Sequence, residues 1–201
     1  MFNILDLIRC KFHHLVTNNG PNYNVIPANP AVGLLYVTEK NLGFVSGHIR
    51  MRGKNGGQYP YRYLEMIDTI FGKNDNTIEV CSGNVKGNCH EVDSNPNTNP
   101  DLVGDGQRLD GIPDGRFSRA RFDPPYNDRT AKEMYGTDLP NPSKLLKAGA
   151  RVCKPGSLIF LLLGQQNYQI HPKGVVRIGY VNITVVPNNE VRCLNIFYKL
   201  C

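Results

Sequence analysis

The residues with the clearest chemical potential in this sequence form the stretch Asp123-Pro124-Pro125-Tyr126. It follows an alternating run, residues 117–122, that predicts a β-strand. Because two consecutive prolines have no N–H for a sheet ladder, the strand must end at Asp123, which leaves Tyr126 on a rigid turn. An acid and two fixed carbonyls can accept hydrogen bonds from a planar amino group, while the aromatic ring stacks on the base that carries this group. A proline-rich loop without chemical function is the alternative interpretation.

The size and composition of the chain are those of one globular domain. It has 201 residues, of which 40% are hydrophobic and 20% charged, enough for a substantial core. No run reaches the ~18 apolar residues of a membrane helix, and residues 1–8 include Asp6 and make a poor signal peptide. The sequence therefore predicts a cytoplasmic protein without membrane association.

Positive charge is concentrated in the first third of the chain. Residues 1–63 contain seven Lys and Arg but two acids, a net charge of +5 out of the total of +6. This pattern indicates a polyanion partner, although a solvated surface can have the same composition. Within it, Arg50, Arg52 and Lys54 alternate with glycines in residues 50–58. They predict a mobile loop that contacts phosphates, with a plain connector as the alternative.

The six cysteines indicate no metal centre. They form no CxxC pair, and Cys81, Cys153 and Cys193 lie among apolar residues, as small buried hydrophobic residues do. Cys10, His13 and His14 have suitable spacing for a ligand set, but only Cys89 and His90 could complete it. We therefore predict no metal.

Hydrophobic periodicity predicts the elements that position these residues. The first 60 residues form an N-terminal extension with a helix at 1–16, a hairpin at 31–36 and 42–49, and the basic loop. The remaining residues, 61–201, form the main domain, in which we expect strands at 77–81, 89–93, 117–122, 158–163, 175–186 and 191–200, and helices at 61–71 and 143–152. Residues 127–137 read as a polar loop and Pro155-Gly156 as a turn.

The first two strands of the main domain carry features of a nucleoside site. Residues 77–81 lead into a small-residue turn, 82–87, and the next strand ends at Asp93. Such a turn lets the backbone approach a ligand, and the acid can accept from ribose hydroxyls. The glycines do not form GxGxxG, which argues against a dinucleotide.

These motifs, in their order, resemble the class I S-adenosylmethionine-dependent methyltransferases over residues 60–201. The resemblance is carried by Glu79-x-Cys81-x-Gly83, Asp93, Gly104-Asp105-Gly106-Gln107 and Asp123-Pro124-Pro125-Tyr126. The last motif is similar to the catalytic motif of enzymes that methylate exocyclic amino nitrogens, above all adenine N6. The resemblance implies an α/β, Rossmann-like methyltransferase fold with a mainly parallel sheet and a terminal antiparallel hairpin. The compact interval between Glu79 and Asp93 predicts a first helix reduced to almost a turn.

The resemblance also implies a role for each motif. S-adenosylmethionine would lie across the strand ends, with Glu79, Cys81 and Gly83 at its methionine part, Asp93 on the ribose, Asp105 and Gln107 by the adenine, and Asp123 nearby. The catalytic residues would be Asp123, Pro124, Pro125 and Tyr126. Hydrogen bonds from the target amine to Asp123 and to the Pro124 carbonyl would aim its lone pair at the methyl group, while Tyr126 stacks on the base.

The implied substrate is nucleic acid, with adenine N6 in DNA favoured over RNA. The alternatives are an RNA base methyltransferase, a non-catalytic methyltransferase-like subunit that binds nucleic acid, and an enzyme acting on a small molecule or a protein glutamine. No insertion after Tyr126 is long enough for a target-recognition domain. Target specificity is therefore left to the first third, to residues 127–137, or to a partner subunit or second copy in a homodimer.

Overall fold

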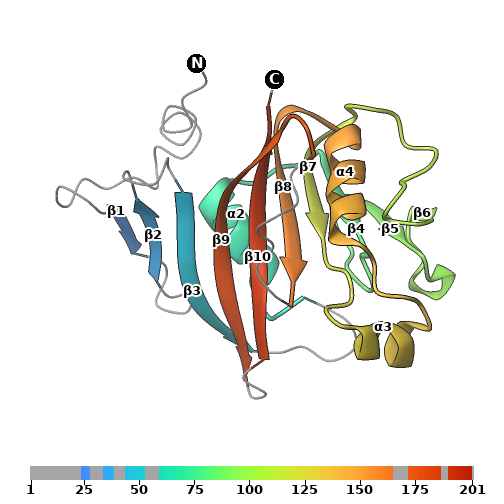
Figure 1. The fold of residues 1–201 in the computed structure, drawn as a ribbon, viewed down its shortest axis with the longest axis horizontal. Helices are drawn as coiled ribbons and strands as arrows, with labels where there is room; N and C mark the ends of the chain where they lie inside the picture. Colours follow the sequence, from blue (N-terminus) through green and yellow to red (C-terminus); the bar gives the residue numbers. More distant parts are fainter. Residues whose placement is uncertain are drawn as a thin grey trace.

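In the computed structural model, the described residues are 24–27, 34–38, 44–52, 59–164, 172–186 and 190–200. Their strands form one sheet in the order β1-β2-β3-β9-β10-β8-β7-β4-β5-β6 (Figure 1). The strands are β1 (Asn24–Pro27), β2 (Leu34–Thr38), β3 (Phe44–Arg52), β4 (Thr77–Val80), β5 (His90–Asp93), β6 (Leu102–Val103), β7 (Phe117–Phe122), β8 (Cys153–Leu163), β9 (Val175–Val186) and β10 (Glu190–Lys199). The helices are α2 (Tyr63–Phe71), α3 (Asp128–Tyr135), α4 (Pro142–Val152) and the 3-10 helix η2 (Pro96–Thr98). The predicted helix at 1–16 and Lys54 lie outside these residues.

The direction of the strands confirms the predicted α/β class. Strands β6, β5, β4, β7 and β8 are parallel, and β10 enters antiparallel between β8 and β9. From β4 the chain adds β5 and β6 on one side, and then β7 and β8 on the other. Ligands of open α/β sheets bind at the carboxyl ends of the strands beside such a reversal. The sheet therefore points to the ends of β4 and β7.

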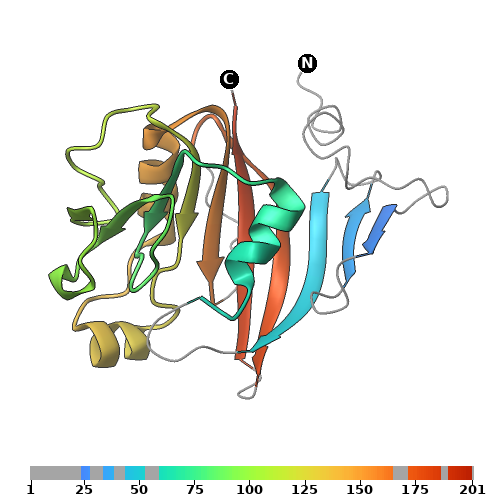
Figure 2. The same ribbon diagram turned by 180° about the vertical axis from the view of Figure 1, so that it is seen from behind.

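Two helices cover opposite faces of the sheet, α4 in Figure 1 and α2 in the reverse view of Figure 2. Alternate residues of β8 show how the sheet forms a core with a helix on each face. Leu158, Phe160 and Leu162 join the core cluster of α2, whereas Ile159 and Leu161 join the cluster of α4. Because side chains of a strand alternate between faces, this apolar run supports two cores at once, as expected for a central strand.

Close packing of α4 fixes the end of β7. The helix begins at an Asn141 cap, whose side chain accepts from the N–H groups of Ser143 and Lys144, an arrangement that satisfies free helical donors. Further along, a Cβ on Gly149 would lie 2.7 Å from the ring of Phe122. The bare glycine therefore lets α4 approach the residue that immediately precedes Asp123.

The first third of the chain extends the same sheet. Strands β2 and β3 form the predicted antiparallel hairpin, and β3 pairs in parallel with β9. Arg50 and Arg52 belong to β3, paired with Thr184 and Val186, so the prediction of a loop from residue 50 is wrong at 50–52. Strand β3 continues past its own apolar residues because it pairs with β9, a strand that lies far along the sequence.

Three local predictions have further outcomes. Residues 127–137 were predicted as a loop, but most of them form α3, which is capped by Asn127 and Gly136 and buries only Ala131. The predicted turn at Pro155-Gly156 lies inside β8, opposite a register shift in β7. No helix occurs in residues 81–89, between β4 and β5, which confirms the reduced connection. None of the described helices is long and apolar enough to cross a membrane.

Candidate active site

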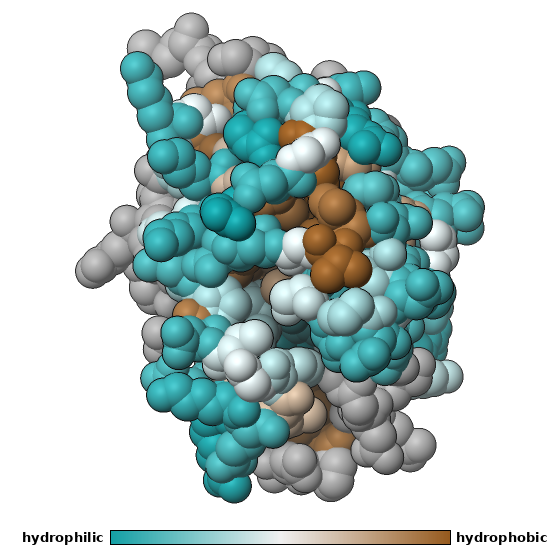
Figure 3. Space-filling model, turned by 90° about the vertical axis from the view of Figure 1, so that its right-hand side faces the viewer, coloured by the Kyte–Doolittle hydropathy of each residue, from teal (hydrophilic) through white to brown (hydrophobic). Residues whose placement is uncertain are grey.

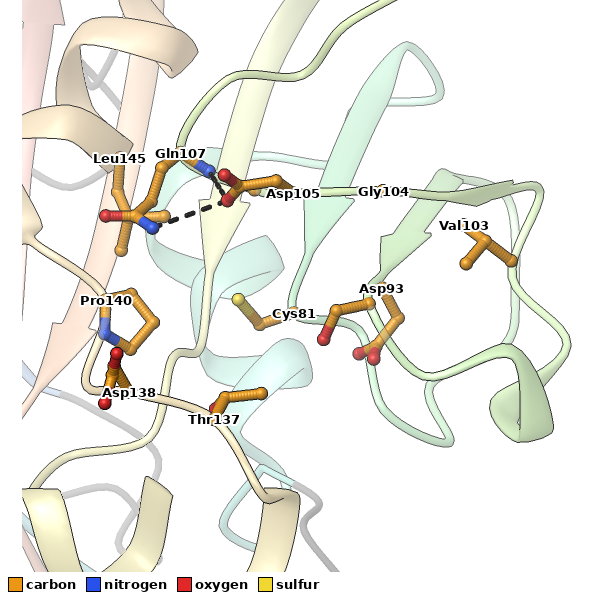
Figure 4. A pocket seen from close by; sticks show the side chains of 12 residues that line it. Cys81, Asp93, Val103, Gly104, Asp105, Gln107, Thr137, Asp138, Pro140 and Leu145 are labelled. Atoms are coloured by element: carbon orange, nitrogen blue, oxygen red, sulfur yellow. Dashed lines mark hydrogen bonds between the residues drawn. The ribbon is translucent and has the colours of Figure 1, made fainter. Parts of the chain in front are cut away.

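A pocket of about 440 Å³ lies at the carboxyl ends of β4 and β5, beside the point between β4 and β7 where the strand order reverses. Figure 4 shows Cys81 between Asp93 and Asp105, with Thr137 and Pro140 of the α3–α4 connection facing them. The face of the molecule seen in Figure 3 is mostly hydrophilic, with apolar side chains gathered near its centre and in smaller areas elsewhere. The pocket therefore brings together residues from the ends of β4 and β5, the β6 region, the α3–α4 connection and α4 itself.

The turn after β4 holds Asp93 in place. Cys81 has φ 56 and Gly83 φ 51, left-handed values that let the chain turn sharply but are uncommon for a cysteine. The Gly83 N–H donates to Asp93 Oδ2 at 2.8 Å, and the Asn95 N–H donates to Oδ1 at 2.8 Å. Gly83 does not line the pocket; it orients the carboxylate that does.

Asp105 and Gln107 form the opposite wall of the pocket. The Gln107 N–H donates to Asp105 Oδ1 at 2.8 Å, and the Gln107 side-chain oxygen accepts from the Asn141 N–H at 2.9 Å (Figure 4 shows the first). Between them, a Cβ on Gly106 would lie 2.5 Å from Val80 Cγ1. The loop after β6 thus packs directly on the end of β4 and is tied to the start of α4.

The electrostatics at Cys81 show how the acids converge. Burial raises the pKa of the Cys81 thiol, and the carboxylates of Asp93, Asp123, Asp105 and Glu79 raise it further. The thiol is therefore neutral and no nucleophile, because the thiolate is the reactive form. A site surrounded by several carboxylates favours a ligand with positive charge.

Glu79 lies outside the pocket, in a buried contact between strands. It is fully buried and registers with Arg121 on β7, whose Nε donates to Glu79 Oε2 at 2.6 Å. The Tyr59 hydroxyl donates to the other carboxylate oxygen. Burial raises the pKa of Glu79 to about 7, while Arg121 and Tyr59 act in the opposite direction. Glu79 thus joins β4 to β7 and does not line the pocket.

The Asp-Pro-Pro-Tyr stretch begins where β7 ends, beside the pocket. The Asp123 N–H donates to the Val80 carbonyl at 3.2 Å, so the motif is attached to the residue before Cys81. Its last residue packs against the chain directly after β8, since a Cβ on Gly164 would lie only 2.9 Å from the Tyr126 carbonyl oxygen. Burial raises the pKa of Asp123. The motif is therefore fixed between the ends of β4 and β8.

Sequence reasoning missed Arg192, which reaches the motif from β10. Its Nη2 donates to Asp123 Oδ1 at 2.5 Å, and its guanidinium carbon lies 4.9 Å from the centroid of the Tyr126 ring. The available signal was a single Arg between two apolar residues, in a strand that also contains Glu190, Asn195 and Lys199. A buried charge requires a partner, but nothing in the sequence identifies Asp123 as that partner.

The other predicted ligands lie elsewhere in the sheet or outside the described residues. Arg50 and Arg52 lie on β3, away from the pocket in sheet order. Within the part of the chain that the structure describes, no group of three His, Cys, Asp or Glu residues is arranged to hold a metal. Cys10, His13 and His14 lie outside that part.

Comparisons with known proteins give no assigned family. No family model and no curated protein matches the chain. Among solved structures, TrmN from Thermus thermophilus shares 11% identity at a TM-score of 0.48, over 68% of this chain and 48% of that one. A structure described as "Conversion of a Disulfide Bond into a Thioacetal Group during Echinomycin Biosynthesis" shares 11% at 0.47, over 75% and 86%. This chain thus spans about half the length of TrmN.

A third similar structure is the 1,6-didemethyltoxoflavin-N1-methyltransferase of Burkholderia thailandensis, with bound 1,6-didemethyltoxoflavin and S-adenosylhomocysteine. It shares 9% identity at a TM-score of 0.43, over 68% of this chain and 75% of that one. The chemistry of the pocket and of the Asp-Pro-Pro-Tyr stretch therefore carries the functional argument.

Proposed function

We propose that this protein is an S-adenosylmethionine-dependent methyltransferase that acts on an exocyclic amino nitrogen of a nucleobase, with adenine N6 in DNA favoured. One observation carries the proposal. The acid-lined pocket at the ends of β4 and β5 adjoins the Asp-Pro-Pro-Tyr motif through the Asp123–Val80 hydrogen bond. The proposed cofactor site therefore lies next to a hydrogen-bond acceptor for the target amine. Group transfer between two bound molecules requires this proximity.

The pocket has the chemistry that S-adenosylmethionine requires. When bound, this cofactor supplies a methyl group on a positively charged sulfonium. Asp93 and Asp105 line the pocket and Asp123 adjoins it, so the local charge is complementary to that cation. The Asp93 carboxylate is oriented by two backbone N–H groups and retains lone pairs for ribose hydroxyls. The volume of about 440 Å³ lies within the usual range of small-molecule sites.

The motif can activate an amine by positioning it. An exocyclic amine is a poor nucleophile because its lone pair is delocalised into the ring. When its N–H groups donate to the Asp123 carboxylate and the Pro124 carbonyl, the nitrogen becomes pyramidal and its lone pair turns away from the ring. Asp123 would act here as an acceptor and not as a strong base. The N–C bond would form as the S–C bond of the cofactor breaks, with S-adenosylhomocysteine as the leaving group, and only then would the cationic amine lose a proton, which the Asp123 carboxylate could accept. Tyr126 would stack on the target base.

The polymer and the assembly are part of the same proposal. The net charge of +5 in residues 1–63 supports a nucleic-acid partner. We assign phosphate contacts to Arg50, Arg52 and Lys54, and treat residues 1–60 as a binding extension of a catalytic domain, 61–201. Target specificity would come from this extension, from α3, or from a partner subunit or second copy.

The test is methyl transfer from labelled S-adenosylmethionine to DNA, RNA and protein pools assayed in parallel. We expect label in DNA, and none when Asp123→Ala is used at the same concentration of folded protein. Label in RNA would move the substrate to an RNA base, and label in protein would indicate a glutamine-type amide. Transfer at the parent rate by Asp123→Ala would show that the motif is not the active site.

A further inference from the structure

One side chain from β10 contacts both ends of the Asp-Pro-Pro-Tyr motif. Arg192 donates from Nη2 to Asp123 Oδ1 at 2.5 Å and lies over the Tyr126 ring, 4.9 Å from its centroid. Only 8% of the Arg192 side chain and 10% of the Asp123 side chain are exposed. Charge-assisted hydrogen bonds of this kind are short and strong, so the contact fixes the orientation of the carboxylate.

The contact with Arg192 makes the two carboxylate oxygens of Asp123 inequivalent. Oδ1 is occupied by Arg192, whereas Oδ2 has no hydrogen-bond partner among the described residues. A guanidinium can only donate, and an ionised carboxylate can only accept, through both of its oxygens. Asp123 can therefore satisfy Arg192 with one oxygen and accept from a target amine with the other.

An amide in place of the carboxylate could not serve both partners. With Asp123→Asn, Arg192 would attract the single side-chain oxygen, because a buried cation without an acceptor is costly. The amide NH₂ would then face the target amine, so that two donors oppose each other. The same amide could serve the amine only if Arg192 no longer claimed its oxygen.

We propose that Arg192 is a positioning residue for the methyl acceptor. It holds Oδ1 of Asp123 so that Oδ2 receives the target amine, and it thereby makes a carboxylate obligatory at position 123. This inference rests on the proposed function, since it assigns the roles of the two oxygens within that same site.

Other charged and titratable groups also lie near Asp123, and among the described residues none of them is a second cation bonded to it. They lie on several elements: Tyr59 before α2 and Tyr63 at its start, Glu79 on β4 and Cys81 directly after it, Arg121 on β7, and Tyr135 on α3. Burial raises the pKa of Asp123, and the charge and hydrogen bond of Arg192 oppose that rise. Loss of Arg192 should therefore raise this pKa further and move the acidic limb of the pH–rate profile to higher pH.

The decisive experiment compares four variants in single-turnover methyl transfer: Asp123→Asn, Arg192→Met, their combination, and Arg119→Met. Methionine has a long flexible side chain without a donor, and Arg119 is a buried Arg that contacts Asp68 and the Phe71 carbonyl instead of the motif. We expect Asp123→Asn to lose about a hundredfold or more in rate, the scale of losing one aligned hydrogen bond in the transition state. The combined variant should regain about tenfold or more of that loss. Arg119→Met should have no such effect on Asp123→Asn.

A measurement that needs no activity accompanies it. In protein labelled with ¹³C-aspartate, the Asp123 carboxyl signal, assigned from its absence in Asp123→Asn, should titrate at higher pH in Arg192→Met but not in Arg119→Met. An unchanged titration in Arg192→Met overturns the inference. So does a combined variant no faster than Asp123→Asn when the parent is active. If the parent transfers no methyl group although the titration shifts, the proposed function fails while the contact stands, and the role of Arg192 in methylation falls with that function.

Discussion

Replacing Asp93 by alanine tests the cofactor pocket most economically. The Asp93 carboxylate accepts from Gly83 and Asn95 through one oxygen each, which orients its remaining lone pairs for two ribose hydroxyls. A hydrogen bond to a charged group contributes ~1.5–3 kcal/mol, and ~1.4 kcal/mol corresponds to tenfold in affinity. Loss of even one such bond should weaken S-adenosylmethionine binding by roughly tenfold to a hundredfold. Isothermal calorimetry with the folded variant measures this directly.

The matched control is Asp101→Ala. Asp101 Oδ2 likewise accepts from a backbone N–H, that of Glu91, at 2.9 Å, but Asp101 lies outside the pocket. Asp101→Ala therefore removes a carboxylate that accepts from a backbone N–H, as Asp93→Ala does, but it removes no proposed ribose ligand. Unchanged affinity in Asp93→Ala, or an equal loss in Asp101→Ala, would refute the assignment of Asp93 to the ribose.

Substitutions at three other positions probe the surroundings of the site. Gly106→Ala would bring a Cβ to 2.5 Å from Val80 Cγ1, so we expect ~1–3 kcal/mol of destabilisation in denaturant unfolding; an unchanged midpoint would contradict the close packing. The folded pKa of Glu79, about 7, is raised from 4.5, so its contribution to stability is complete below pH 4.5 and is lost as the pH rises through 7. At ~1.4 kcal/mol per unit, this decline is about 3 kcal/mol, and unfolding of Glu79→Gln at several pH values should lack it; equal pH dependence in both proteins would argue against a buried, titrating Glu79. Tyr126→Phe should retain most of the turnover, whereas Tyr126→Ala should lose the ~1–3 kcal/mol of base stacking; equal damage by both would mean that the hydroxyl and not the ring is needed.

Local patterns were sufficient to predict much of the fold. Strand β7 occupies the predicted residues, Phe117–Phe122, because its alternation is regular and two prolines end it. The apolar run of β8 and the final hairpin also carry unambiguous patterns. Helix α3 was missed because its residues are polar and only Ala131 is buried. Its capping residues, Asn127 and Gly136, were the signal that hydrophobic periodicity does not detect.

Contacts that depend on strand register could not be predicted in this way. Glu79 meets Arg121 because β4 and β7 pair in one particular register, and a one-residue shift would turn the side chain to the other face. Arg192 lies 69 residues after Asp123 in the chain. The two meet because β10 inserts into the sheet beside β8. The residue types at the site can be identified from the sequence, but the residues that they contact depend on how the strands pair in the assembled sheet.

The central claim is that the Asp-Pro-Pro-Tyr motif presents a base amine to a methyl group held in the adjacent pocket. The most direct test is a single-turnover reaction with labelled S-adenosylmethionine and unmodified DNA, followed by digestion to nucleosides and separation of the labelled product. The account predicts that the label co-migrates with N6-methyl-2′-deoxyadenosine and disappears with Asp123→Ala. Label on a ring carbon or a ring nitrogen, or no label in any nucleic acid despite cofactor binding, would contradict it.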